Sequence, residues 1–240
     1  MNSTAAEDYL KTIYDLCESE AASTTAIAAR LGLAPGSVTG MLKRLADQGL
    51  VEHVPYHGAR LTPAGAQQAV DLIRRHRIVE MFLVQILGYT WDRVHDEAER
   101  LEHVVSDELI ERMATVLGSP DVDPHGAPIP ALGQTFVERK YPSLNDIAVG
   151  RCAILRRVHD EDPDVLRYLA ELQLVPGVEI TVVGRGPFNG PLFLEVGENT
   201  RVVSADVAGS LFVEESENPS TATGGKKGKG RHAGIGGTDA

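Results

Sequence analysis

The stretch HDEAERLEH at residues 95–103 places two histidines and four carboxylates within nine positions. If the stretch is helical, at about 100° per residue, these side chains separate into two groups. One group lines up beside the apolar stripe and would face a neighbouring helix: His95, Glu99, Glu102 and His103. Asp96 and Arg100 lie on the solvent side. The pattern predicts a row of potential metal ligands at the edge of a buried face.

More donors of the same type occur on two earlier predicted helices. His76 and Glu80 are four residues apart beside an apolar face, and Asp8 lies near the start of the first helix. Crowded carboxylates repel one another, and burial raises the cost, whereas a divalent cation removes both problems and ties the helices together. A solvated acidic face is the alternative for any single residue. No His-Glu-x-x-His or Cys-x-x-Cys motif occurs, so the zinc-peptidase signature and the paired cysteines of structural zinc sites are missing.

The N-terminal part has the element order of a winged helix-turn-helix. Helical spacing predicts a helix over 7–20, a second from 24 that stops at Gly32, and a third that begins after the turn at 33–35 and ends near Gly49. Two short strands are expected around Tyr56–Gly58, followed by a helix that begins at 62–63. Such a third helix enters the DNA major groove, although an ordinary helical bundle has a similar pattern.

The charge distribution supports DNA binding by one end of the protein. The chain carries a net charge of −11, yet residues 24–62 contain four cationic side chains against two acidic ones. We therefore expect contacts with DNA bases or phosphates from five residues of the third helix and the ribbon: Pro35, Ser37, Thr39, Lys43 and Arg60.

The remaining sequence predicts a helical region followed by a β-rich region. Residues 64–88 and 91–118 are each expected to form one long helix, apolar enough to pack against a partner subunit. Pro and Gly mark a boundary in 118–145. Short β-forming runs between 147 and 215, interrupted by one helix over 162–174, predict a small β-barrel. The last residues, 216–240, lack an apolar pattern and are expected to be a disordered tail.

The composition favours a cytoplasmic protein. No apolar run approaches the roughly 18 residues of a membrane span, and residues 1–10 lack the pattern of an export signal. Cys17 and Cys152 are too few for a disulfide framework and are expected to be small buried hydrophobes.

Several segments together resemble the diphtheria toxin repressor family, in its manganese-responsive branch, over about residues 5–215. They are EDYLKTIY, the helix-turn-helix, RRHRIVE, VHDEAERLEHVVSDE, PHGAPIP and the β-rich end. The resemblance implies a mainly α protein with a β C-terminal domain: a winged helix-turn-helix at 1–72, a helical dimerisation and metal-binding domain with a Pro-rich linker at 73–140, and an SH3-like (FeoA-like) domain at 147–215. It further implies a homodimer that binds a palindromic operator when loaded with metal and represses metal-uptake genes, with no organic substrate and no membrane partner.

The resemblance also implies two groups of metal ligands. One matches Asp8, Glu99, Glu102 and His103. The second matches His76, Glu80 and His95, and His125 and Asp160 are the candidates that complete it. Asp123 lies where some relatives have a Cys ligand.

Two departures from relatives bear on the choice of metal. Iron-responsive members have Met and Cys where this chain has Asp8 and Glu99, and carboxylates move the preference from softer ions towards Mn²⁺, with Fe²⁺ as the second possibility. Some manganese-responsive members have a bridging Glu where this chain has Lys11, so a closely spaced metal pair that uses this position is not expected.

The expected mechanism is linkage between metal binding and DNA binding. Metal would hold the first helix against the later ones and thereby set the spacing of two recognition helices to about one DNA turn, roughly 34 Å. Without metal, repulsion among Asp8, Glu99 and Glu102 would loosen the arrangement. The alternatives are a carboxylate- and histidine-rich metalloenzyme and a metal-independent winged-helix regulator of a small organic ligand. The C-terminal barrel has three possible roles: supplying metal ligands, stabilising the dimer, or binding the Pro-rich linker.

Overall fold

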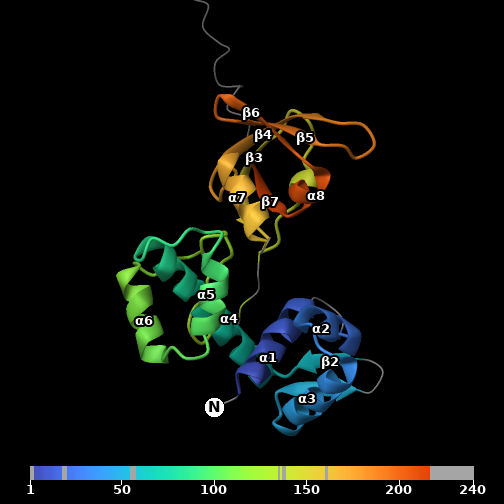
Figure 1. The fold of residues 1–240 in the computed structure, drawn as a ribbon, viewed down its shortest axis with the longest axis vertical. Helices are drawn as coiled ribbons and strands as arrows, with labels where there is room; N and C mark the ends of the chain where they lie inside the picture. The colour runs from blue at the N-terminus through green and yellow to red at the C-terminus, as the bar shows by residue number, and fades with distance from the viewer. Residues whose placement is uncertain are drawn as a thin grey trace, which may run out of the picture.

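The computed structural model describes residues 3–17, 21–54, 58–134, 136, 139–159 and 162–216. Within them the chain forms an N-terminal head, a central helical unit and a C-terminal β unit (Figure 1). Most of the predicted tail, 217–240, lies outside the described residues, as do Tyr56, His57 and Asp160. None of the described helices combines the length and the apolar character needed to cross a membrane.

The head consists of α1 (Thr4–Leu16), α2 (Thr24–Leu31), α3 (Pro35–Asp47) and the antiparallel pair β1 (Val51–Val54) and β2 (Gly58–Leu61). Ser23 caps α2 by accepting a hydrogen bond from the Ala26 amide, and Gly32 ends it in the left-handed conformation. Leu10, Ile27 and Leu42 of the three helices are fully buried together. The predicted order of three helices and a ribbon is confirmed, although α1 begins at Thr4, earlier than expected.

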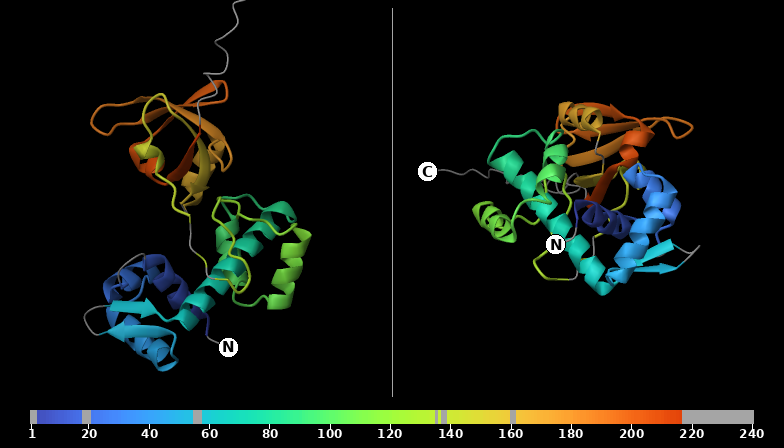
Figure 2. Two further views of the ribbon diagram at one scale, coloured as in Figure 1. Left: turned by 180° about the vertical axis from the view of Figure 1, so that it is seen from behind. Right: turned by 60° about the horizontal axis from the view of Figure 1, so that its bottom comes forward.

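One helix, α4 (Pro63–Gln85), joins the head to the helical unit and can be followed from one to the other in Figures 1 and 2. Its first turn lies against the start of the ribbon. A Cβ on Gly65 would approach the Leu50 carbonyl oxygen to 2.0 Å, so only glycine fits this contact. The ribbon and α4 are thereby packed closely, and a movement of α4 carries the head with it.

The prediction of one long helix over 91–118 is wrong. The segment forms α5 (Val94–Leu101) and α6 (Asp107–Val116), which are separated by a turn. Ser106 accepts a hydrogen bond from the Leu109 amide and caps α6, whose first turn is acidic. This local capping outweighs the continuous apolar periodicity. Glu102 therefore ends α5, and His103 lies in the turn.

The linker is held against the helical unit and the head by backbone carbonyl groups. Arg77 donates to the Pro128 carbonyl at 2.5 Å and Arg74 donates to the Pro130 carbonyl at 2.9 Å. The Tyr14 hydroxyl of α1 donates to the Phe136 carbonyl at 2.9 Å. The chain between the helical unit and the C-terminal unit thus contacts both α4 and the head.

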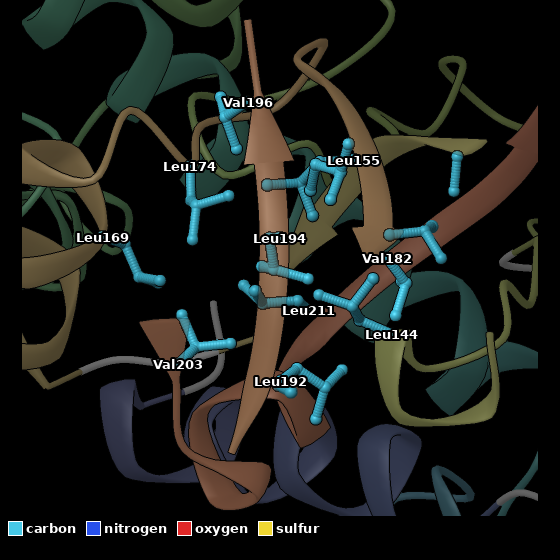
Figure 3. Packing of buried hydrophobic residues seen from close by; sticks show 14 of the residues in the cluster. Leu144, Leu155, Leu169, Leu174, Val182, Leu192, Leu194, Val196, Val203 and Leu211 are labelled. Carbon is cyan, nitrogen blue, oxygen red and sulfur yellow. The ribbon is translucent and has the colours of Figure 1, made fainter. Parts of the chain in front are cut away.

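The C-terminal unit is a five-stranded antiparallel sheet in the order β6-β5-β4-β3-β7. Its elements are η1 (Leu144–Asp146), β3 (Cys152–Val158), α7 (Pro163–Glu171), β4 (Glu179–Arg185), β5 (Leu192–Val196), β6 (Asn199–Val203), α8 (Ala205–Gly209) and β7 (Leu211–Ser216). Figure 3 shows the leucines and valines of the strands packed around Leu194. The β-rich region and its helix α7 are confirmed. Among the described residues β6 does not pair with β7, so closure into a barrel stays a prediction.

The C-terminal unit docks on the segment that contains His125. The Val158 amide of β3 donates to the His125 carbonyl at 2.9 Å, and a Cβ on Gly126 would meet the Arg156 carbonyl oxygen at 1.9 Å. Arg167 of α7 forms a 3.1 Å ion pair with Asp92, which is buried just before α5. The candidate ligand His125 is therefore located where the C-terminal unit meets the helical unit.

Candidate metal centre

The Glu102 carboxylate lies at the centre of the site and is completely buried at the end of α5. His76 Nδ1 of α4 lies 2.5 Å from its Oε2, and Lys11 Nζ of α1 lies 3.2 Å from each of its oxygens. His103 Nε2, from the turn after α5, lies 3.5 Å from Oε1. Three helices thus converge on one buried charge.

Asp8, Glu102 and His103 form the first group of potential ligands. His103 Nε2 lies 3.0 Å from Asp8 Oδ1, and the other ring nitrogen, Nδ1, lies 2.7 Å from Glu7 Oε2. Metal-ligating histidines are commonly oriented in this way, with the second nitrogen bound to a carboxylate. Burial raises the pKa of Asp8, and the neighbouring His103 opposes that shift. The cluster joins α1 of the head to the helical unit.

His76, Glu80 and His95 form the second group. His76 Nε2 lies 3.0 Å from Glu80 Oε1 and 3.2 Å from His95 Nδ1, which is itself 3.4 Å from Glu80 Oε1. Burial alone would lower the pKa of His76, but the Glu80 charge and the hydrogen bond to Glu102 raise it to about 9. Although burial opposes it, the His76 charge holds the pKa of Glu80 well below its usual range. Without metal, the imidazole is therefore a cation that donates to both carboxylates.

Glu99 does not join Asp8 in this structure. Its Oε1 is 2.5 Å from Lys11 Nζ and 3.6 Å from His76 Nδ1, and it groups with His76 and Glu102. Burial opposes the shift, but the Lys11 ammonium lowers the pKa of Glu99. Burial alone would lower the pKa of Lys11 as well, yet Glu102 and Glu99 raise it. The repulsion expected between these two carboxylates is thus offset by an ammonium group between them.

Glu80 also belongs to a further group, with Asp123 and His125. His125 Nδ1 lies 3.8 Å from Glu80 Oε2. The other ring nitrogen, Nε2, donates to the Trp91 carbonyl at 2.9 Å, so Nδ1 is the nitrogen that faces the carboxylate. Asp123 Oδ1 accepts from the His125 and Ala127 amides at 2.8 and 2.9 Å. Burial raises the pKa of Asp123, and Glu80 adds to that shift. Asp160 lies outside the described residues, so its relation to this group stays a prediction.

The donor chemistry fits a divalent cation. In each of these groups one oxygen or nitrogen atom per residue lies within 4.8 Å of the others. Glu80, Glu102 and His76 are buried, where unpaired charges are costly and a cation would stabilise the carboxylates. The donors are hard oxygens and imidazole nitrogens, a set that suits Mn²⁺ and also accepts Fe²⁺.

The candidate DNA-contacting residues lie on the exposed side of the head. Pro35 and Ser37 are exposed in the first turn of α3, and Lys43 is exposed two turns further along. Arg60 is exposed on β2. The half-buried Thr39 hydroxyl donates to the Pro35 carbonyl at 3.1 Å, so its hydrogen is already engaged within the helix.

Three residues of the site were not assigned a role from the sequence. Glu7 orients His103, and only its position beside Asp8 on the first helix indicated it. Lys11 was noted as a departure from relatives, but its identity does not show that the ammonium faces inward. Asp123 lies within a Pro- and Gly-rich segment, where helical spacing gives no information about which side chains converge.

Comparison with family models divides the chain into three matches. Residues 1–59 match the N-terminal DNA binding domain of iron dependent repressors, residues 62–131 match their metal binding and dimerisation domain, and residues 143–215 match the FeoA domain. Together these matches span most of the chain.

Individual relatives agree with these models. The iron-dependent repressor IdeR of Mycobacterium leprae (strain TN) is 30% identical over 223 residues, which cover 87% of this chain and 96% of the relative. The diphtheria toxin repressor of Corynebacterium diphtheriae is 30% identical over 220 residues, with the same coverage of 87% and 96%. Among solved structures, a manganese-dependent transcriptional repressor in complex with manganese is similar with a TM-score of 0.80 and 36% identity, covering 88% of this chain and 100% of that one. ScaR with bound Cd²⁺ has a TM-score of 0.75 at 36% identity, with 88% and 99% covered.

The raised pKa of His76 predicts how the stability of the metal-free protein depends on pH. The protonated imidazole stabilises the folded state fully below its ordinary value of 6.5, and this stabilisation is lost as the pH rises through about 9. In chelator, the wild type should have a higher free energy of unfolding than His76→Gln at pH 6. This difference should shrink as the pH rises from 6 to 9.5. Urea denaturation at several pH values measures it. A difference that stays constant over this range would contradict the assigned charge of His76.

Proposed function

The chain belongs to the family of iron-dependent repressors that includes the diphtheria toxin repressor, and from this premise we propose that it binds operator DNA as a homodimer in response to Mn²⁺, with Fe²⁺ as the second ion. The proposal assigns the DNA-binding domain to residues 1–72, the dimerisation and metal-binding domain to 73–140 and the SH3-like domain to 147–215. The genes it represses would be those of metal uptake.

A single observation carries this proposal: ligands from the head and from the helical unit meet at one place. Asp8 is on α1, whereas Glu102 and His103 end α5 and begin the following turn. A cation bound there neutralises buried carboxylates and holds the two units together. Glu7 keeps Nε2 of His103 turned towards Asp8 and Glu102, so the donor atoms are preorganised.

The residues around this cluster explain how loading would be coupled to DNA binding. The head is attached to the helical unit through the continuous α4 and through side-chain contacts of α1 with α5 and the turn after it, Lys11 with Glu99 and Asp8 with His103. Strengthening the second contact fixes the orientation of α3 relative to the dimerisation helices. In a homodimer, that orientation decides whether two α3 helices reach successive major grooves, about 34 Å apart. The ion therefore acts by selecting a pose of the head.

The choice of Mn²⁺ rests on the donor set. Asp8 and Glu99 supply carboxylates, and no cysteine belongs to any ligand group found among the described residues. Oxygen and imidazole donors suit Mn²⁺, whereas thiolate and thioether donors favour softer ions. The solved relatives described above include a repressor titled as manganese-dependent, which supports the same choice.

A second ion would link the helical and C-terminal units. Glu80, Asp123 and His125 supply its donors, and His125 is held to β3 of the C-terminal unit by the Val158 amide. Asp160 follows β3 closely in the sequence and is proposed as a further ligand. In this proposal the C-terminal domain contributes to metal binding and stabilises the loaded form.

The shared carboxylate of Glu102 should be required for the metal response. DNA can be selected from a random pool by the Mn²⁺-loaded wild type and then used to measure affinity with Mn²⁺ and with chelator. We expect Mn²⁺ to raise the affinity of the wild type by on the order of tenfold or more. Glu102→Gln should abolish this gain, because it removes a charge that belongs both to the group with Asp8 and His103 and to the group with His76 and Glu99.

Glu108→Gln is the matched control, since Glu108 is an exposed residue of α6 that pairs with Arg112. It should respond to Mn²⁺ as the wild type does. Equal operator affinity of the wild type with and without Mn²⁺ would overturn the proposed function. A normal response of folded Glu102→Gln would overturn the assignment of the site.

The chain's single tryptophan reports on the group formed by Glu80, Asp123 and His125. Trp91 stacks on His125 with ring centroids 5.6 Å apart. Paramagnetic Mn²⁺ bound to His125 should quench Trp91 fluorescence in the wild type. Asp123→Asn should lower the Mn²⁺ affinity obtained from this quenching by about tenfold, because it removes one of the ligands. Asp121→Asn removes an exposed charge two residues away and serves as the control. Identical titrations of the two variants would exclude Asp123 as a ligand.

A further inference from the structure

Lys11 places a positive charge between the groups of potential ligands. Its Nζ lies 2.5 Å from Glu99 Oε1 and 3.2 Å from both oxygens of Glu102. The side chain is 19% exposed, and it leaves α1 one turn after Asp8. Among the described residues it is the lysine that contacts these groups, and its partners are two residues proposed to hold metal.

The same Glu102 oxygen serves Lys11 and the first ligand group. Glu102 Oε1 is 3.2 Å from Lys11 Nζ and 3.5 Å from His103 Nε2. A divalent cation held by Asp8, Glu102 and His103 would therefore share a carboxylate with an ammonium and be repelled by it. Glu99 is likewise engaged by Lys11 and is not available to the Asp8 group in this arrangement.

We propose that Lys11 competes with the metal ion for Glu99 and Glu102 and so sets the Mn²⁺ concentration at which the protein loads. The inference rests on the proposed function, because it concerns the same site. In the metal-free protein, the ammonium of α1 supplies the positive charge that these α5 carboxylates need. On loading, the ion takes over the neutralisation and the ammonium withdraws.

The structure provides room for this withdrawal. A cleft of about 410 Å³ opens beside the site and is lined by Asp8, Lys11, His95 and Glu99 among others. A lysine has a flexible four-carbon stem, so its ammonium can turn into the cleft while α1 stays in place. The same cleft gives an ion access to Glu99 and His95. Exchange of ammonium for metal therefore needs no unfolding of α1.

If Lys11 competes with the ion, Lys11→Met should change the thermal stability of the metal-free protein and its affinity for Mn²⁺ in opposite directions. Without metal, the variant leaves Glu99 and Glu102 less neutralised, so its thermal stability in chelator should fall. Its affinity for Mn²⁺ should rise by about tenfold or more, because the competing charge is gone. A purely structural role for Lys11 would lower both quantities.

The test is Mn²⁺ titration of the full chain, in which free Mn²⁺ is measured by electron paramagnetic resonance, together with thermal melts in chelator. Lys11→Arg keeps the charge and should bind Mn²⁺ within about threefold of the wild type. Lys140→Met makes the same charge change at an exposed residue outside the ligand groups and should bind as the wild type does. If Lys11→Met does not fold, Lys11→Gln, whose amide can still donate to Glu99, carries the same expectation.

Unchanged or weaker Mn²⁺ binding by folded Lys11→Met would overturn the inference. This failure is distinct from failure of the proposed function. If the wild type binds Mn²⁺ but its operator affinity does not respond, the proposed function fails while the competition at Lys11 still stands on the binding data. If the operator affinity responds and Lys11→Met binds Mn²⁺ as the wild type does, only the inference about Lys11 fails.

Discussion

A buried carboxylate needs a positive partner, and the arrangement of the helices in this protein follows from that need at Glu102. Its side chain is fully buried, and an unpaired charge in such a place costs several kcal/mol. His76 comes from α4, Lys11 from α1 and His103 from the turn after α5. Because each partner is on a different element, pairing this one charge holds the head, the connecting helix and the helical unit together.

The same requirement links ion binding to the position of the head. Without metal the positive charges are an ammonium and a protonated imidazole, both supplied by the chain. In the proposed function, a divalent ion would offer a denser charge to the same carboxylates and would make the junction of α1 and the end of α5 firmer. Since α4 runs without a break from the head into the helical unit, a firmer second contact leaves the head little freedom. The C-terminal unit is attached at His125 by a backbone hydrogen bond from the Val158 amide, and the His125 ring lies beside another buried carboxylate, Glu80.

Much of the fold could be predicted because its signals are local. The helices and ribbon of the head and the strands after residue 147 follow from apolar periodicity, caps and turn residues. Helical spacing also brought His76 together with Glu80, and placed Glu99 and Glu102 at the edge of a buried face. The break between α5 and α6 could not be predicted because the apolar periodicity continues across it. The new helix begins at Ser106, which caps α6. The apolar stripe itself marks a buried face, since Val94 and Ala98 are buried and Val105 packs against the same core, so it gave no sign of the turn.

The contacts that unite the site could not be predicted in the same way. That Lys11 reaches Glu99, 88 positions away in the sequence, depends on how α1 and α5 each pack against α4, which no local pattern encodes. The position of Asp123 beside Glu80 depends on the path of a Pro- and Gly-rich segment. The assignment of Glu99 to the Asp8 group came from resemblance to relatives, and in this structure its carboxylate turns to Lys11 instead.

In the proposed function, metal strengthens the side-chain contacts between α1 and the end of α5. Amide hydrogen exchange of the DNA-free protein, compared in Mn²⁺ and in chelator, tests it directly. Mn²⁺ should slow exchange in α1 (Thr4–Leu16) and in the turn after α5, while exchange in the distant strands β5 and β6 should stay the same. Exchange in α1 that does not respond to Mn²⁺, at concentrations that load the protein, would contradict it.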